Sequence, residues 1–203
     1  MAEIIDNLIY EKELLKKGYR YICGVDEVGR GPLCGPVCTC AVVMDMAKIV
    51  QGVTDSKKLS EKKRNFLFDL IKENAISYAI AMMDNNQIDT LNILNATKEC
   101  MKHSITSLEI KPDIVLVDAL KLDIDIEQMS LIKGDLYSYS IGCASILAKV
   151  TRDNLMQEYA KIYPEYDLAS NKGYGTKKHI EAIKKYGITD IHRKTFVKNF
   201  INE

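Results

Sequence analysis

Apolar stretches with the length of a β-strand recur along the chain, separated by segments with helical spacing. Four such stretches lie at 21–28, 37–44, 75–83 and 113–118. The first two are joined by a short turn at 31–36 that is rich in Gly and Pro, which predicts a β-hairpin. In the fourth, four consecutive apolar residues stand between Asp113 and Asp118, a pattern typical of a strand buried on both faces. A shorter edge strand that ends in a turn is predicted at Leu131–Asp135.

Apolar residues three and four positions apart fill most of the intervening segments and indicate helices. This spacing predicts helices at 3–17, 86–108, 139–163, 177–186 and 193–200. Ser60 is a suitable N-cap for a further helix of about 13 residues. Gly18 and Pro164 are stop signals for the first and the longest of these helices. Because strands and helices alternate without a repeat or a linker, the chain is expected to be an α/β protein.

Length and composition favour one globular domain over residues 1–203. Hydrophobic residues make up 47% of the chain and charged residues 28%, as in ordinary soluble proteins. No apolar run approaches the roughly 18 residues that a membrane helix requires. The charged N-terminus also lacks the apolar core of a signal peptide. We therefore expect a cytoplasmic protein, monomeric and without a membrane partner.

The six cysteines show no pattern of a metal site. None forms a C-x-x-C pair, and apart from His103, three residues after Cys100, no histidine lies near them along the sequence, so we expect no zinc site. In a cytosolic chain they are expected to be reduced and to pack in the core as small apolar residues.

Charge is distributed unevenly although the formal net charge is zero. Residues 84–135 hold ten acidic residues against five Lys and Arg, whereas residues 171–203 hold eight Lys and Arg against three acidic residues. An acidic middle beside a basic tail suits a cation site next to a surface that binds a polyanion. The alternative is a solvated charge pattern without a function.

The stretch Tyr21–Pro36 contains the most distinctive chemistry of the chain. Its apolar strand ends in two adjacent carboxylates, Asp26 and Glu27, and the tract Gly29-Arg30-Gly31 follows at once. Glycines let backbone N–H groups approach a ligand closely, and an arginine among them is a fixed cation suited to phosphate. The alternative is a tight turn with a solvated acidic pair.

A further carboxylate, Asp118, stands at the C-terminal end of the buried strand 113–118. Sites in α/β proteins commonly form at the carboxyl ends of strands, so Asp118 is a candidate for the same site. The alternative is that Asp118 only caps a turn.

Neighbouring residues of a regular strand point to opposite faces, which is an obstacle for Asp26 and Glu27. If both reach one site, the strand has to end, bulge or twist near 28–29, where Gly29 makes such a change feasible.

The motif at 21–36, YICGVDEVGRGPLCGP, closely resembles the signature of the type 2 ribonucleases H, the bacterial ribonuclease HII group. The resemblance covers nearly all of the chain: it continues in TDSKKLS (54–60), NILNAT (92–97), LIKGD (131–135), ASILAKVTRD (144–153), NKGYGT (171–176) and HRKTF (192–196). Ala119 stands where the family usually has glycine, and Gly142 and Cys143 interrupt an alanine run. These are small-for-small changes that leave the carboxylates in place.

The resemblance implies a ribonuclease H-like mixed β-sheet flanked by helices, with a helical C-terminal segment at about 164–203 that closes over nucleic acid. It implies that Asp135 supplies the last carboxylate and that Lys57 lies near the cleaved strand. It also implies that Gly29, Arg30 and Gly31 contact a ribose 2′-hydroxyl. Tyr174 is then expected to stack on the next sugar, although a lone tyrosine is more often a buried core residue.

Together, Asp26, Glu27, Asp118 and Asp135 form a set of hard oxygen ligands that suits Mg²⁺ or Mn²⁺. Two such ions about 4 Å apart can activate water and stabilise the leaving oxygen of a phosphoryl displacement. The expected activity is hydrolysis of RNA in RNA–DNA hybrids and cleavage on the 5′ side of single ribonucleotides in duplex DNA, giving 3′-hydroxyl and 5′-phosphate ends. This activity would remove primers and misincorporated ribonucleotides.

Two other functions compete with this one. The sister type, ribonuclease HIII, prefers RNA tracts, but it usually has an extra N-terminal domain and a lysine in place of the arginine in G-R-G. The 20 residues before the first predicted strand are too few for such a domain, and Arg30 is present. The second is a nucleic-acid-binding domain without activity, in which the acidic cluster is structural.

Overall fold

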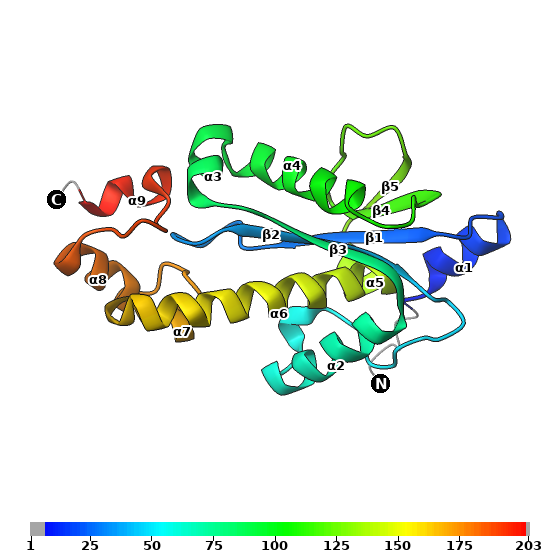
Figure 1. Ribbon diagram of the computed structural model, residues 1–203, viewed down its shortest axis with the longest axis horizontal. Helices are drawn as coiled ribbons and strands as arrows, with labels where there is room; N and C mark the ends of the chain where they lie inside the picture. Colours follow the sequence, from blue (N-terminus) through cyan, green and yellow to red (C-terminus); the bar gives the residue numbers. More distant parts are fainter. Residues whose placement is uncertain (1–6, 202–203) are drawn as a thin grey trace.

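A mixed β-sheet forms the centre of the molecule (Figure 1). The computed structural model describes residues 7–201. In the order β3-β2-β1-β4-β5, the strands are Ala75–Met83, Val37–Met44, Ile22–Val28, Ile114–Asp118 and Glu127–Leu131. β1 pairs antiparallel with β2 and β2 with β3, whereas β1 pairs parallel with β4 and β4 with β5. The mixed sheet and the β1–β2 hairpin are thus confirmed.

The edge strand was predicted at the wrong place. β5 ends at Leu131, where Leu131–Asp135 was expected to begin a strand. Lys133 adopts a left-handed conformation with φ 57°, and the short helix α5 (Gly134–Tyr137) starts immediately afterwards. The strand itself, EQMSL, is mostly polar and only partly buried, so no apolar alternation marks it.

Helices cover both faces of the sheet. α3 (Asn85–Leu91) and α4 (Ile93–Thr106) lie on one face, and α2 (Glu61–Asn74) and the long α6 (Tyr139–Ile162) lie on the other (Figure 1). The single helix predicted at 86–108 is wrong in one respect: Asn92, with φ 63°, divides it into α3 and α4 and caps α4. The first helix, predicted at 3–17, is α1 (Ile9–Lys16), while residues 3–6 lie outside the described residues.

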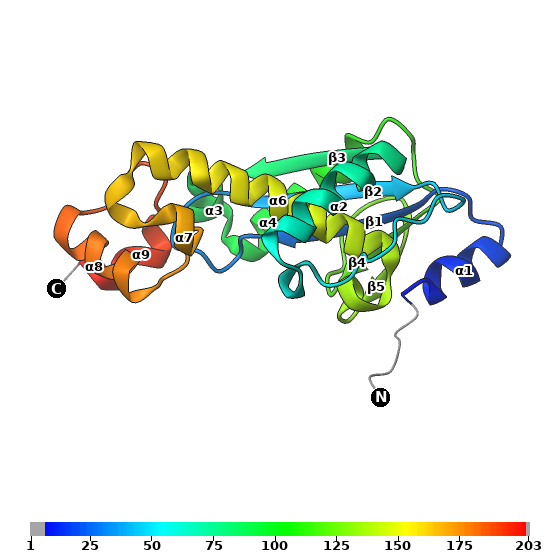
Figure 2. The ribbon, with the colours of Figure 1, turned by 90° about the horizontal axis from the view of Figure 1, so that it is seen from below.

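The remaining helices form the C-terminal segment, α7 (Leu168–Asn171), α8 (Lys177–Tyr186) and α9 (Lys194–Ile201). Both views place them together at one end of the molecule, beyond the turn between β1 and β2 (Figures 1 and 2). The segment is joined to this turn by an isolated β-bridge between Cys34 and His192 and by the bond from Leu33 N to Gly173 O at 2.8 Å. Within residues 7–201, no helix has the length and hydropathy of a membrane span.

Close packing of α6 on the sheet creates the larger part of the core. Apolar residues of α6 meet β2 and α2 in one buried cluster that includes Cys40, Ile71, Cys143 and Leu147. All six cysteines are buried and unpaired, as expected of core residues. At the crossing with β1, a Cβ on Gly24 would lie 2.1 Å from the carbonyl carbon of Ser140. The helix can therefore approach β1 only because residue 24 has no side chain.

Substitution Gly24→Ala should force α6 away from β1. The expected loss in the free energy of unfolding is about 1–3 kcal/mol, the usual effect of overpacking, measured by urea unfolding. Gly187→Ala is a suitable control, because no atom lies within 4 Å of its added Cβ although φ is +83°. That control should lose only about 1–2 kcal/mol, from backbone strain alone. Unchanged stability of Gly24→Ala would contradict the packing described for β1 and α6.

Candidate active site

Parallel pairing of β1 with β4 brings the first carboxylates together. Val25 is paired with Val117, so Asp26 and Asp118 follow at the same edge of the sheet. Asp118 Oδ1 accepts a hydrogen bond from Gly134 N at 2.7 Å, which brings the start of α5 and its Asp135 to the strand end. Three segments distant in sequence thus meet at one point.

Asp26 and Glu27 leave β1 toward opposite faces. Asp26 lies beside Cys40 and is hydrogen-bonded by Ser145 of α6. Glu27 lies beside Thr39, whose hydroxyl contacts α4. The pairing of β1 with β4 ends at Val25 and Val117, so Asp118 follows at the strand end. Its charge acts on both Asp26 and Glu27. β1 ends at Val28 and Gly29 follows with φ +93°, so the strand end comes after both carboxylates, and Asp26 and Glu27 keep the alternation of a regular strand.

These carboxyl groups influence one another strongly. Burial raises the pKa of Asp26 well above its ordinary value, and the charges of Glu27 and Asp118 raise it further. Burial also raises the pKa of Glu27, against the lowering effect of Arg30, and burial followed by Asp118 raises the pKa of Asp135. Asp26 is only 5% exposed, so a solvated acidic pair is the wrong description. The cluster needs positive charge to hold all its carboxyls ionised.

The residues fit a divalent cation. All donors are hard oxygens, and Glu27 Oε2 is buried without a hydrogen-bond partner among the described residues. Asp26 Oδ1 accepts a bond from Glu27 N at 2.7 Å, while Glu27 Oε1 lies 3.5 Å from Arg30 Nη1. Among the described residues, no three of these carboxylates have ligand atoms within 4.8 Å of one another.

Lys57 extends from the loop between β2 and α2 toward this cluster. Burial tends to lower the pKa of its ammonium group, but the charges of Asp26, Asp135, Asp55 and Glu27 together raise it above its ordinary value. The loop is attached to α6 by a 2.9 Å hydrogen bond between the hydroxyls of Ser56 and Ser145. Since Ser145 also bonds Asp26, one serine pair connects the lysine loop with a candidate ligand.

The glycine tract lies between the carboxylates and Tyr174. Arg30 and Gly31 are exposed, and a Cβ on Gly31 would lie 3.4 Å from the Tyr174 ring. Tyr174 itself is 44% exposed, so it is not a core aromatic residue. The structure thus places Lys57 beside the candidate ligands and Tyr174 beside the tract, and Arg30 connects the two groups through its 3.5 Å contact with Glu27.

Comparison with known proteins identifies the family to which the chain belongs. The profile of the family described as Ribonuclease HII matches residues 23–200. The chain belongs to the ribonuclease HII family. The resemblance seen in the sequence is confirmed, and with it the expectation of an enzyme, a ribonuclease H that hydrolyses nucleic acid.

Similar proteins agree with this assignment. The chain is 55% identical over 192 residues to the ribonuclease HII of Caldicellulosiruptor saccharolyticus, covering 94% of each protein. Its fold is similar to the crystal structure of ribonuclease H2 from Pyrococcus horikoshii, with a TM-score of 0.75, 27% identity and coverage of 91% of this chain and 100% of the other. A Bst ribonuclease HIII solved with Mn²⁺ has a related fold, with a TM-score of 0.61, 20% identity and coverage of 84% of this chain and 64% of the other.

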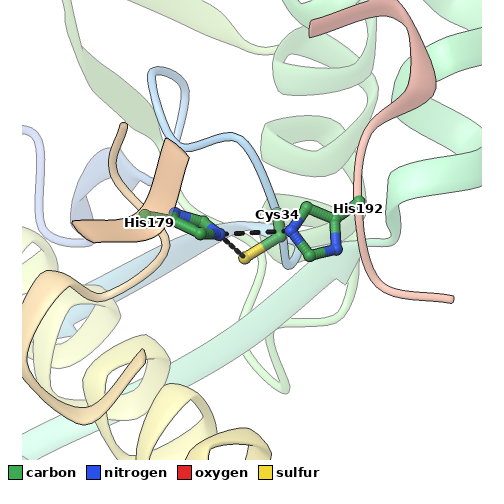
Figure 3. A group of neighbouring side chains, drawn as sticks. All are labelled: Cys34, His179 and His192. Carbon is green, nitrogen blue, oxygen red and sulfur yellow. Dashed lines mark hydrogen bonds between the residues drawn. The ribbon is translucent and has the colours of Figure 1, made fainter. Parts of the chain in front are cut away.

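His179 and His192 form a buried pair (Figure 3), and His179 is hydrogen-bonded to the backbone carbonyl of Tyr174. His192 Nδ1 accepts a bond from Thr189 N at 2.9 Å, so a neutral ring carries its proton on Nε2, 3.1 Å from His179 Nε2. His179 Nδ1 then donates to Tyr174 O at 2.9 Å. Every ring nitrogen of the pair has a partner.

Apart from His103, which follows Cys100 by three residues, no histidine lies near a cysteine along the sequence, but in space the prediction is wrong. Cys34 Sγ is 4.0 Å from His179 Nε2 (Figure 3). Cys34 and His192 come together because the bridge between them joins segments distant in the sequence. Burial raises the pKa of the Cys34 thiol to about 12, so this sulfur is not a ready thiolate ligand.

Several polar residues of the site were not identified from the sequence. These are Ser56, Ser145, Arg152, His179, His192 and Arg193, all buried. The available signal was weak: Ser145 and Arg152 belong to the helical stretch ASILAKVTRD, which also contains the polar residues Lys149, Thr151 and Asp153. A sequence motif gives the type and spacing of such residues, but it does not show what each side chain contacts.

Stability should fall in mild acid because of the histidine pair. Burial lowers the pKa of His179, and burial with the neighbouring His179 lowers that of His192 to about 4. A lowered folded-state pKa means that the stabilisation is complete above the ordinary value of 6.5 and is lost as pH decreases toward 4. The His192 contribution is about 3 kcal/mol.

Urea unfolding of the wild type and His192→Gln between pH 7.5 and 4.5 measures this effect. The variant should be less stable at pH 7.5 and should lose less stability on acidification. His103→Gln, at an exposed position of α4, serves as the control and should keep the wild-type slope. Equal slopes for the wild type and His192→Gln would contradict the assignment.

Proposed function

We propose that the protein hydrolyses RNA in RNA–DNA hybrids and cuts on the 5′ side of single ribonucleotides embedded in duplex DNA. The observation that carries this proposal is the position of the glycine tract. It lies directly between a carboxylate cluster suited to phosphoryl transfer and an exposed tyrosine. A site that only bound nucleic acid would not require four carboxylates beside a polyanion, because they would repel it.

Asp26, Glu27 and Asp118 are proposed as direct ligands of divalent cations, with Asp135 completing a second site. When bound, Mg²⁺ or Mn²⁺ supplies a polarised water and charge neutralisation at the phosphate. The chain's own contribution is rigidity: Ser145 holds Asp26, and Gly134 N holds Asp118. Mn²⁺ is the ion in the related ribonuclease HIII structure.

Lys57 and Arg30 are proposed to bind the strand that is cut. Both are cations at the border of the cluster, and Arg30 already lies 3.5 Å from Glu27. Arg30 offers a planar guanidinium to a phosphate once a cation takes over the charge of Glu27. The exposed lysines of α8, at 177, 178, 184 and 185, extend the positive surface for the duplex.

Ribose is proposed to be recognised by the backbone of Gly29, Arg30 and Gly31. Only the 2′-hydroxyl distinguishes a ribonucleotide from its deoxy counterpart at a matched base. Tyr174 borders Gly31, so its ring is well placed to stack on the following sugar. A deoxyribose fits a close ring better than a ribose, which would explain recognition of an RNA-to-DNA junction.

A duplex with one ribonucleotide, digested with and without Mg²⁺ or Mn²⁺, tests the proposed function. Asp118→Asn should abolish cleavage while the protein still binds the hybrid. The asparagine amide oxygen can still accept the bond from Gly134 N, so the variant should fold normally. Asp125→Asn, an exposed change on the connection between β4 and β5, is the matched control and should remain fully active. Full activity of Asp118→Asn would remove the metal-dependent scheme.

Tyr174→Ala should leave the fold intact and weaken cleavage at a single ribonucleotide far more than cleavage inside a long RNA tract. The expected loss is one stacking interaction of about 1–3 kcal/mol, or roughly 5- to 150-fold. Tyr186→Ala removes another exposed tyrosine of the C-terminal segment and should affect both substrates little. Rates on the two substrates decide the matter: equal losses for Tyr174→Ala would exclude junction sensing.

A further inference from the structure

Two fully buried arginines, Arg152 and Arg193, lie behind the glycine tract without an ion-pair partner among the described residues. Burial lowers the pKa of Arg193 to about 9, and the neighbouring charge of Arg152 contributes. A buried guanidinium normally pairs with a carboxylate. Here backbone carbonyls take that role, which indicates a use for these charges beyond packing.

Arg193 is bonded to the loop at its front. Its Nη2 donates to Gly29 O at 2.6 Å and to Gly35 O at 2.9 Å, its Nη1 donates to Arg30 O at 2.9 Å, and its Nε donates to Gly35 O at 3.0 Å. Its own N–H donates to Leu33 O at 2.9 Å. One side chain from the C-terminal segment therefore determines the direction of two successive carbonyls in the tract.

Arg152 is bonded to the rear of the same loop. Its three donor groups reach Pro36 O at 2.8 Å, Lys172 O at 2.9 Å and Cys34 O at 3.1 Å. None of these carbonyls belongs to the Gly29-Arg30-Gly31 tract. The two arginines are thus alike in burial and in type of partner, and Arg152 packs against Gly29, but only Arg193 donates hydrogen bonds to the tract.

Fixing a carbonyl also fixes the next N–H, because a trans peptide is planar and its C=O and N–H point in opposite directions. With Gly29 O and Arg30 O directed at the buried guanidinium, the N–H groups of Arg30 and Gly31 point away from it, on an exposed stretch of chain. Neither N–H has a hydrogen-bond acceptor among the described residues. Two adjacent free donors remain, next to the Tyr174 ring.

We propose that Arg193 is the positioning residue for sugar recognition: it orients the peptide units after Gly29 and Arg30 so that their N–H groups meet the ribose 2′-hydroxyl. The inference rests on the proposed function and adds the residue that makes it selective. Lysine cannot replace this arginine. Its single ammonium group lacks the planar guanidinium whose separate nitrogens reach the carbonyls of Gly29, Arg30 and Gly35. Removal of Arg193 should therefore reduce discrimination between ribose and deoxyribose, and not only affinity.

Binding selectivity measures the effect directly. The probe is a pair of duplexes, identical except for one ribonucleotide, and the background is Asp118→Asn, so that neither duplex is cut. The ratio of the two dissociation constants should fall about tenfold in Arg193→Lys, as expected for the loss of one well-placed hydrogen bond. Arg152→Lys should lose comparable thermal stability but keep most of the ratio.

Chemical rescue covers the case in which Arg193→Lys does not fold. Arg193→Ala leaves a cavity of guanidinium shape, and added methylguanidinium should restore the ratio more than it restores the melting temperature. A ratio that stays at the wild-type value in Arg193→Lys, or falls equally in Arg152→Lys, would overturn the inference, as would rescue of melting temperature alone. If the parent protein itself binds the two duplexes equally, the proposed function fails first.

Discussion

The parallel register between β1 and β4 is the constraint on which the site depends. It pairs Ile22 with Ile114 and Val25 with Val117, and it stops just before the carboxylates begin. A shift by one residue would move Asp118 to the opposite face of the sheet, away from Asp26 and from the Gly134 N–H that holds it. The apolar residues that set this register are buried, so the packing of the core also fixes the position of the candidate ligands.

Around this fixed point, the structure places charge in unusual surroundings. Acidic side chains are buried next to one another on one side of the glycine tract, and guanidinium groups are buried next to one another on the other. Neither group neutralises the other directly, since the tract's peptide dipoles lie between them. The guanidinium groups are satisfied by backbone carbonyls, whereas the cations that act on the carboxyl groups are Arg30 and Lys57. Charge of each sign is therefore stabilised by a separate part of the fold.

Sequence patterns located the elements where the local signal is strong. β2, β3 and α8 have the predicted bounds, because long apolar runs or a clear amphipathic period mark them. β5 was misplaced because its residues are mostly polar, and the break at Asn92 was missed because the apolar period continues across it. Asp26, Glu27 and Asp118 could be proposed from strand ends alone, whereas Asp135 was assigned only through the family motif. The roles of Ser145, the histidine pair and the arginines arise from contacts between distant segments, which periodicity cannot reveal.

The distance along the chain between the glycine tract and its organising arginine has a consequence for folding. Arg193 and the Arg30 carbonyl are separated by 163 residues, and Arg152 and the Pro36 carbonyl by 116. Closing loops of this length costs entropy before any contact compensates for it, so these bonds should form after the sheet and α6 have assembled. The backbone of the Gly29-Arg30-Gly31 tract would therefore be among the last parts of the chain to become ordered, although it directly follows the first strand in the sequence.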